Sequence, residues 1–186
     1  MLNVRRRVWV SVLVLAVLAL SVGLVMSRQR SRATDGFVYL HGVLKVAASA
    51  DQTVLLTLRG PGGQRRYTRA QLEALPAVRY RAFQPQLKQD FEYVGVPLRD
   101  LAALVGLTGQ PLQLQASDNF STTIQPNDYQ DHPVMLAYQA DGHPIDIQQK
   151  GPLLAVFPNL DEPARFPNPV YGSRWAWYVE RIGGGQ

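Results

Sequence analysis

The chain has 186 residues, no cysteine and a formal net charge of +5 at pH 7. Six arginines and no acidic residue lie within residues 1–34, so the rest of the chain carries 13 basic and 14 acidic residues and a net charge of −1. A body without excess cation cannot neutralise many phosphates, which excludes a basic nucleic-acid binder. The missing cysteines exclude disulfides, cysteine–zinc sites and thiolate nucleophiles.

The N-terminal stretch is typical of a membrane segment. Residues 8–27 carry no charge, and twenty residues at about 1.5 Å each span the ~30 Å hydrocarbon core of a bilayer. We expect residues 1–27 to form an uncleaved anchor and residues 28–35 a polar tether, with the domain exported. The alternative is a cleaved signal peptide, because Ala19-Leu20-Ser21 is a weak cleavage pattern. Arginines flank the segment on both sides, so the positive-inside rule does not fix its orientation.

Residues 36–182 are expected to form one domain. In its first half, the pattern of apolar residues predicts strands over residues 37–44, 53–58, 78–83 and 91–96. Thr68 and Gln71 form a capping box that predicts a short helix. Pro97 is expected at the first position of a second helix, which Gly106 ends.

The second half of the domain is also predicted to be rich in strands, at residues 112–116, 120–124, 134–139, 145–147, 153–157 and 175–182. Asp141-Gly142 is a hairpin turn signal, and residues 126–129 suit one helical turn. Residues 159–173 read as a Pro-rich loop without regular structure, and residues 183–186 as a disordered tail. The sequence therefore predicts an α+β, mostly β fold, a sandwich or partly closed barrel with two or three short helices.

An aromatic stretch near the end of the chain is the first candidate for a ligand site. If residues 175–182 form a strand, Trp175, Trp177 and Val179 share one face. The tryptophans could fill the core, or they could present a wide aromatic surface beside Arg174 to a flat heteroaromatic ligand. We expect Trp177 to lie in the core and Arg174 and Trp175, at the loop end of the strand, to contact the ligand.

Two aspartates in predicted turns are further candidates. Asp118, followed by Asn119, comes directly after a strand, and Asp128, followed by Tyr129, lies in the expected helical turn. Such a carboxylate either caps a turn or accepts N–H bonds from a ligand. The three histidines show no short metal-ligand spacing, and no nucleophile or phosphate-loop motif is present.

The order of several motifs resembles the molybdopterin-binding domain of the sulfite-oxidase superfamily, across residues 36–182. The matching segments are Phe91-x-Tyr93-Val94-Gly95-Val96-Pro97-Leu98-Arg99-Asp100-Leu101, Ala116-Ser117-Asp118-Asn119-Phe120, Pro126-Asn127-Asp128-Tyr129, Leu136-Ala137-Tyr138, Asp141-Gly142-x-Pro144, Gly151-Pro152-Leu153 and Trp177-x-Val179-x-x-Ile182. The resemblance implies that superfamily's β-rich fold and a pterin-shaped pocket. Its enzymes hold molybdenum through a cysteine thiolate, in the stretch that corresponds to Arg81 through Gln84 here, and this chain has none.

The chain is most similar to the small, cysteine-free, periplasmic or membrane-anchored members that bind free pterins. Those members regulate a membrane-bound cyclic-di-GMP enzyme through its periplasmic domain. The resemblance implies an exported, non-catalytic pterin sensor at the periplasmic face of a bacterial inner membrane, or in the periplasm if the anchor is cleaved. A molybdopterin-dependent oxidoreductase and a ligand-free interaction module of the same fold are the alternatives.

A pterin would make specific demands on the expected site. Its amino-oxo edge presents neighbouring N–H donors to a carboxylate and a carbonyl to a cation or N–H group. Asp118 is the first choice for the carboxylate and Asp128 the second, and Arg174 is expected to serve the carbonyl. Trp175 is the expected stacking platform. The remaining expected contacts are Tyr138, Tyr129, Asn119 and Arg81.

Overall fold

The computed structural model describes residues 37–40 and 51–185. The expected anchor and tether lie outside the described residues, as does the second half of the first expected strand, residues 41–44. Within those two ranges no helix is both long and apolar enough to cross a membrane. The described part of the first strand forms one antiparallel bridge, between Tyr39 and Val78.

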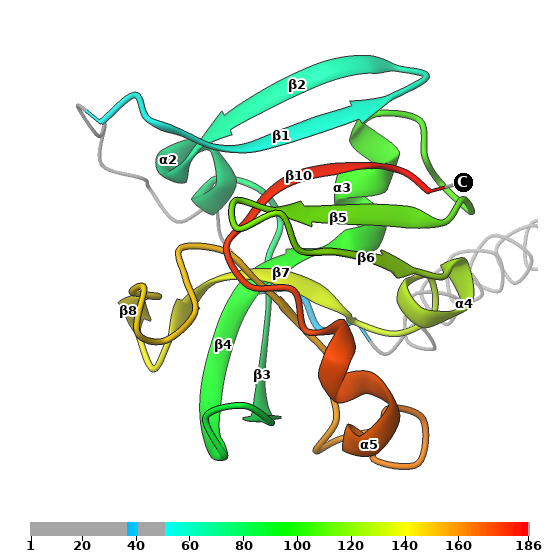
Figure 1. Ribbon diagram of the computed structural model, residues 1–186. Helices are drawn as coiled ribbons and strands as arrows, with labels where there is room; N and C mark the ends of the chain where they lie inside the picture. Colours follow the sequence, from blue (N-terminus) through cyan, green and yellow to red (C-terminus); the bar gives the residue numbers. More distant parts are fainter. Residues whose placement is uncertain (1–36, 41–50, 186) are drawn as a thin grey trace, which may run out of the picture. The chain divides into compact units, whose positions relative to one another are not determined.

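One of the two sheets has five strands in the order β2-β1-β10-β5-β6 (Figure 1). Its members are β1 (Val54–Gly60), β2 (Gly63–Thr68), β5 (Leu112–Ala116), β6 (Ser121–Ile124) and β10 (Val179–Gly184). β1 and β2 form one antiparallel hairpin and β5 and β6 another. β10 pairs parallel with β1 and antiparallel with β5, so the last strand joins the two hairpins into one sheet.

The second sheet has the order β3-β4-β7-β8, with β9 paired to β7. Its members are β3 (Val78–Gln84), β4 (Gln89–Pro97), β7 (Met135–Ala140), β8 (His143–Pro144) and β9 (Leu154–Val156). A Cβ at Gly95 would overlap the backbone of Leu136, so glycine is needed where β4 and β7 approach each other. Asp141 and Gly142 both have positive φ, 48° and 80°, as the predicted hairpin turn between β7 and β8 requires.

The helices are short: α2 (Arg69–Glu73), α3 (Leu98–Leu104), α4 (Pro126–Tyr129), α5 (Asn168–Tyr171) and the 3-10 turn η1 (Gly172–Arg174). The predicted capping box starts α2: Gln71 N donates to Thr68 Oγ1 at 3.4 Å, and Thr68 N donates to Gln71 Oε1 at 2.9 Å. Pro97 is the residue before α3 rather than its first, because its ψ of 137° is still extended. Gly106, with a φ of 74°, follows the end of α3.

Residues of both sheets and of α3 form one hydrophobic core. Leu56 and Leu58 enter it from β1, Leu98 and Leu101 from α3, and each is fully buried. Burying one such side chain contributes about 1.5–3 kcal/mol. The prediction of a mostly β, α+β domain with a few short helices is confirmed, in the form of two sheets around a shared core.

The last strand is shorter at its start than predicted and longer at its end. It begins at Val179 rather than at Trp175, because Tyr178 has a φ of 52°, which interrupts an extended strand. The assumed alternation therefore does not apply to the two tryptophans. β10 continues to Gly184, two residues into the expected disordered tail, where Gly183 and Gly184 pair with β5.

Two other segments also differ from the prediction. Residues 145–147 are not a strand; β8 ends at Pro144. The Pro-rich loop over residues 159–173 contains α5 and the start of η1, so the described residues hold four short α-helices instead of two or three. Proline at the first turn of α5 is compatible with a helix, because that turn has no partner for the missing N–H.

Candidate functional site

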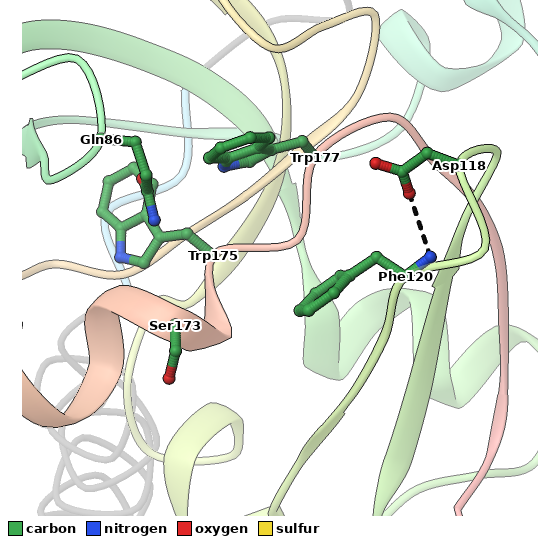
Figure 2. Close-up of a pocket in the computed structure, with 6 residues that line it drawn as sticks. All are labelled: Gln86, Asp118, Phe120, Ser173, Trp175 and Trp177. Carbon is green, nitrogen blue, oxygen red and sulfur yellow. Dashed lines mark hydrogen bonds between the residues drawn. The ribbon is translucent and has the colours of Figure 1, made fainter.

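A cavity of about 280 Å³ lies among segments that connect the strands of the two sheets (Figure 2). The turn between β5 and β6 supplies Asp118 and Phe120, and the β3–β4 connection supplies Gln86. Ser173 of η1 and the segment that follows it, with Trp175 and Trp177, complete the lining. Three of the six side chains are aromatic, which makes the cavity suited to a flat, mostly apolar ligand.

Only one of the two carboxylate oxygens of Asp118 accepts a hydrogen bond from a described residue. Phe120 N donates to Asp118 Oδ1 at 3.0 Å, which fixes the turn. The other carboxylate oxygen has no hydrogen-bond partner among the described residues, and in Figure 2 it points to the side where Trp177 lies. Asp118 thus both caps a turn and presents an acceptor to the cavity.

Asn119 shapes this turn instead of lining the cavity. Its φ is 68°, a left-handed conformation that asparagine adopts more readily than most residues. Its backbone N–H donates to Ala116 O at 3.3 Å. The side chains of Asp118 and Phe120 are placed on the cavity wall by this local geometry.

Trp175 and Trp177 both line the cavity, but their burial is the reverse of the prediction. Trp175 is only 2% exposed, and its ring packs against Tyr93 and Phe157, with ring centroids 6.2 and 6.4 Å away. Trp177 is half-buried, and Lys150 Nζ lies 4.3 Å from its ring centroid. Trp175 is therefore a core residue with one side on the cavity, and Trp177 is the more accessible of the two.

Both indole N–H groups are buried without an acceptor in the described part of the chain. An unsatisfied buried donor costs about 1–3 kcal/mol. A ligand oxygen or ring nitrogen that accepted one of these bonds would recover that cost. Neither nitrogen is accessible from the cavity as it stands, so a ligand can accept from one only if its indole ring shifts on binding.

Gln86 is held in place at the cavity by contacts far away in the sequence. Its Nε2 donates to Gly172 O at 2.6 Å, and its backbone N–H donates to Gln84 Oε1 at 2.7 Å. The amide oxygen of Gln86 is left as a second acceptor at the cavity. No sequence pattern identifies Gln86 or Ser173 as cavity residues. Phe120 could have been identified, because it is an aromatic residue directly after a predicted turn.

Asp128 does not line the cavity, and its carboxylate is fully engaged elsewhere. It is 2% exposed. Its Oδ1 accepts from Arg165 Nη2 at 2.6 Å and from the Tyr171 hydroxyl at 2.8 Å, and its Oδ2 accepts from Arg174 Nη1 at 3.1 Å. Arg174 also lies over the Tyr171 ring, 4.8 Å from its centroid. Asp128 and Arg174 thus bind each other rather than face the cavity.

Three other expected contacts lie outside the cavity lining. Tyr129 is fully buried, and its hydroxyl bonds to the Gln110 carbonyl at 2.7 Å. Tyr138 is buried in β7, and burial raises the pKa of its hydroxyl to about 12. Arg81 is exposed and pairs with Asp90 at 3.9 Å across the β3–β4 hairpin. The structure brings Asp118 and Trp175 together at the cavity, along with Trp177, which was expected in the core. Tyr129, Tyr138 and Arg81 lie away from them.

The donor groups present do not fit a molybdenum–thiolate centre. At the end of β3, where the resemblance places the family's thiolate, Gln84 is fully buried and its Oε1 accepts from the backbone N–H groups of Gln86 and Leu87. In residues 37–40 and 51–185 no three His, Asp or Glu side chains gather as metal ligands. His132 instead pairs with Glu162, at 2.5 Å. Soft metal sites use thiolate sulfur, and this chain has no cysteine; its described methionine, Met135, is a fully buried thioether.

Comparison with known proteins identifies the family. The chain belongs to the oxidoreductase molybdopterin binding domain family, whose model matches residues 44–182. This confirms the resemblance to the sulfite-oxidase type of domain; the closer likeness to small periplasmic regulators stays a prediction. No curated protein matches the chain.

One similar solved structure is the sulfane dehydrogenase SoxCD from Paracoccus pantotrophus, with a TM-score of 0.55 and 22% sequence identity. The match covers 75% of this chain and 40% of the SoxCD chain, so this chain spans less than half of that one. At this identity the likeness shows a shared fold.

Proposed function

We propose that the cavity binds a free pterin and that the protein is a non-catalytic pterin sensor. The observation that carries this proposal is the chemistry of the lining: aromatic walls and one carboxylate oxygen that has no partner among the described residues. A pterin offers the complement of each, since it is a flat bicycle with N–H donors along its amino-oxo edge and acceptors at its carbonyl and ring nitrogens.

In the proposed complex, the second oxygen of Asp118 accepts from the amino-oxo edge. The Trp177 ring shifts on binding so that its indole N–H donates to an acceptor on the pterin ring, and Phe120 and the two tryptophans enclose the faces of the pterin. Aromatic pairs add about 0.5–1.5 kcal/mol each beyond area burial, and a hydrogen bond to a charged group adds about 1.5–3 kcal/mol. Several such contacts together are needed for a micromolar Kd, which corresponds to about −8.2 kcal/mol.

A sensor also needs a surface that responds to the ligand. Ser173 and Trp175 continue directly from α5, whose Val170 is 55% exposed, and nearby in sequence Leu160 is 44% exposed. In our proposal ligand binding changes how α5 presents this apolar surface to a membrane-bound partner. That the partner is a cyclic-di-GMP enzyme with a periplasmic domain, and that residues 8–27 anchor the protein beside it, rest on the family resemblance.

The proposal is tested by equilibrium dialysis of the full chain, purified in a mild detergent, against oxidised and tetrahydro forms of biopterin. We expect a Kd in the micromolar range for at least one form, with a change in tryptophan fluorescence, because two of the three tryptophans line the cavity. The control is Asp131→Asn, which alters an exposed carboxylate outside the cavity. Absence of binding at 500 micromolar ligand, roughly −4.5 kcal/mol, by a protein with a normal circular dichroism spectrum would contradict the proposal.

A molybdopterin-dependent oxidoreductase is the second candidate, and family membership is the observation that favours it. When bound, that cofactor supplies two-electron redox chemistry at molybdenum. Metal analysis of protein from a molybdenum-replete host separates the candidates: we expect less than 0.1 molybdenum per chain, because the thiolate donor is missing. Molybdenum near one per chain would favour the oxidoreductase. A ligand-free interaction module predicts neither metal nor pterin.

A further inference from the structure

Among the described residues, the cavity is lined by one formally charged side chain, and its charge is negative. Of the six described lining residues only Asp118 has an acidic or basic side chain; the other five are Gln86, Phe120, Ser173, Trp175 and Trp177. No arginine or lysine from the described ranges lines it. Within the described lining, a ligand meets one carboxylate and no arginine or lysine.

The basic residues near the cavity are not among its described lining residues. Arg174 lies between two lining residues, yet its guanidinium binds Asp128, which Arg165 also binds. Lys88, two residues after Gln86, and Lys150, whose Nζ lies 4.3 Å from the Trp177 ring centroid, are not lining residues either. The described lining therefore presents no basic side chain to a ligand.

We infer that this cavity selects an unphosphorylated heterocycle and rejects one that carries a phosphate, including molybdopterin itself. The inference rests on the proposed pterin function and narrows its ligand class. A phosphate ester carries nearly two negative charges at neutral pH. Removing those charges from water costs several kcal/mol unless cations compensate, and here the Asp118 carboxylate adds repulsion. The amino-oxo edge, by contrast, gains from the same carboxylate.

The experiment compares two matched pairs of ligands by equilibrium dialysis with the full chain: 6-hydroxymethylpterin with its phosphate ester, and guanosine with guanosine monophosphate. Guanine has the same amino-oxo edge on a different bicycle. We expect the phosphate ester of the pterin to bind at least about thirtyfold more weakly than the free pterin, because repulsion and desolvation add. In Asp118→Asn this ratio should fall to less than tenfold, whereas in Asp131→Asn it should not change.

The outcomes separate the inference from the function on which it rests. Free pterin binding with the expected ratio supports both. Phosphate esters that bind as tightly as, or more tightly than, the free compounds overturn the inference while leaving pterin binding intact, and loss of that advantage in Arg174→Ala would assign the phosphate to the arginines. Guanosine binding over its monophosphate without any pterin binding supports the charge selection and overturns the pterin function. Failure of all four ligands to bind overturns both.

Discussion

Asp118 and Asp128 are ten residues apart, both were predicted to contact a pterin, and the fold gives them opposite environments. Asp118 is exposed and shares one oxygen with a backbone N–H group. Asp128 is buried and accepts hydrogen bonds from two arginines and a tyrosine. Among the described residues, the first carboxylate has an acceptor without a partner at the cavity, and the second holds α4, α5 and η1 together.

The difference shows that the partners of a carboxylate, rather than its position in a turn, decide whether it is available to a ligand. An oxygen that already accepts two bonds inside the protein would have to lose one in order to bind a ligand. The largest expected effects are therefore on stability at Asp128 and on affinity at Asp118.

The largest effect is expected for Asp128→Asn. Two guanidinium groups would lose their common counter-ion, and breaking a buried pair costs about 3–5 kcal/mol. Because Arg165 and Arg174 are about a third exposed, we expect a loss of about 2–4 kcal/mol in the free energy of unfolding, measured by urea titration. Asp131→Asn is the control and should change it by less than about 0.5 kcal/mol. An equally small loss at Asp128 would show that the cluster does not stabilise the fold.

Asp118→Asn is expected to act on binding. The amide oxygen can still accept from Phe120 N, so the free energy of unfolding should stay within about 0.5 kcal/mol of the original value. The lost charge-assisted bond should weaken pterin binding at least about tenfold, which is about 1.4 kcal/mol. Unchanged affinity in dialysis would remove Asp118 from the site. A large loss of stability would instead make it a structural residue like Asp128.

A smaller effect is expected for Trp177→Phe. This change keeps an aromatic ring on the cavity and removes the indole N–H that has no partner in the described chain. A lost neutral hydrogen bond is worth about 1 kcal/mol, so we expect affinity to fall about fivefold. The control is Tyr178→Phe, an aromatic substitution at the next residue, which removes a hydroxyl that donates to the Ile147 carbonyl at 3.2 Å. Equal affinities in the two variants would show that the Trp177 donor does not meet the ligand.

The smallest effect at neutral pH is expected for Tyr138→Phe, which leaves pterin affinity unchanged. The Tyr138 hydroxyl is buried without a partner among the described residues, and burial raises its pKa from 10.0 to about 12. The unfolded chain therefore loses this proton at lower pH than the folded chain does, so stability falls as the pH rises from 10 toward 12. Tyr138→Phe should reduce that slope in urea titrations at pH 9.5, 10.5 and 11.5. An unchanged slope would show that the raised pKa of Tyr138 does not cause the loss of stability at high pH.

Local chemistry explains the parts of the fold that the sequence predicts well. The Thr68 capping box and the Asp141-Gly142 turn each depend on residues within four positions of one another, and both form as expected. Strands with clear apolar patterns, such as β4 and β5, lie within two residues of their predicted bounds. The start of β10 was missed because nothing in the local sequence predicts the positive φ of Tyr178.

The candidate site was predictable only in part, because its lining comes from three distant segments. The side-chain chemistry of Asp118 and Trp175, a carboxylate in a turn and a large aromatic ring, is enough to predict both as ligand contacts. Gln86 reaches the cavity through a bond to Gly172, 86 residues away, and no local pattern contains such a contact. Asp128 and Asp118 look alike in sequence, and only the distant Arg165 and Tyr171 distinguish them.

The position of β10 has a consequence for the order of events during synthesis. This strand lies in the middle of its sheet, between β1 and β5, yet it is the last of the ten described strands to leave the ribosome. Until it arrives, the two outer hairpins have no strand to join them, and an isolated hairpin is marginally stable at best. We therefore expect the five-stranded sheet to form only after nearly the whole domain has been synthesised.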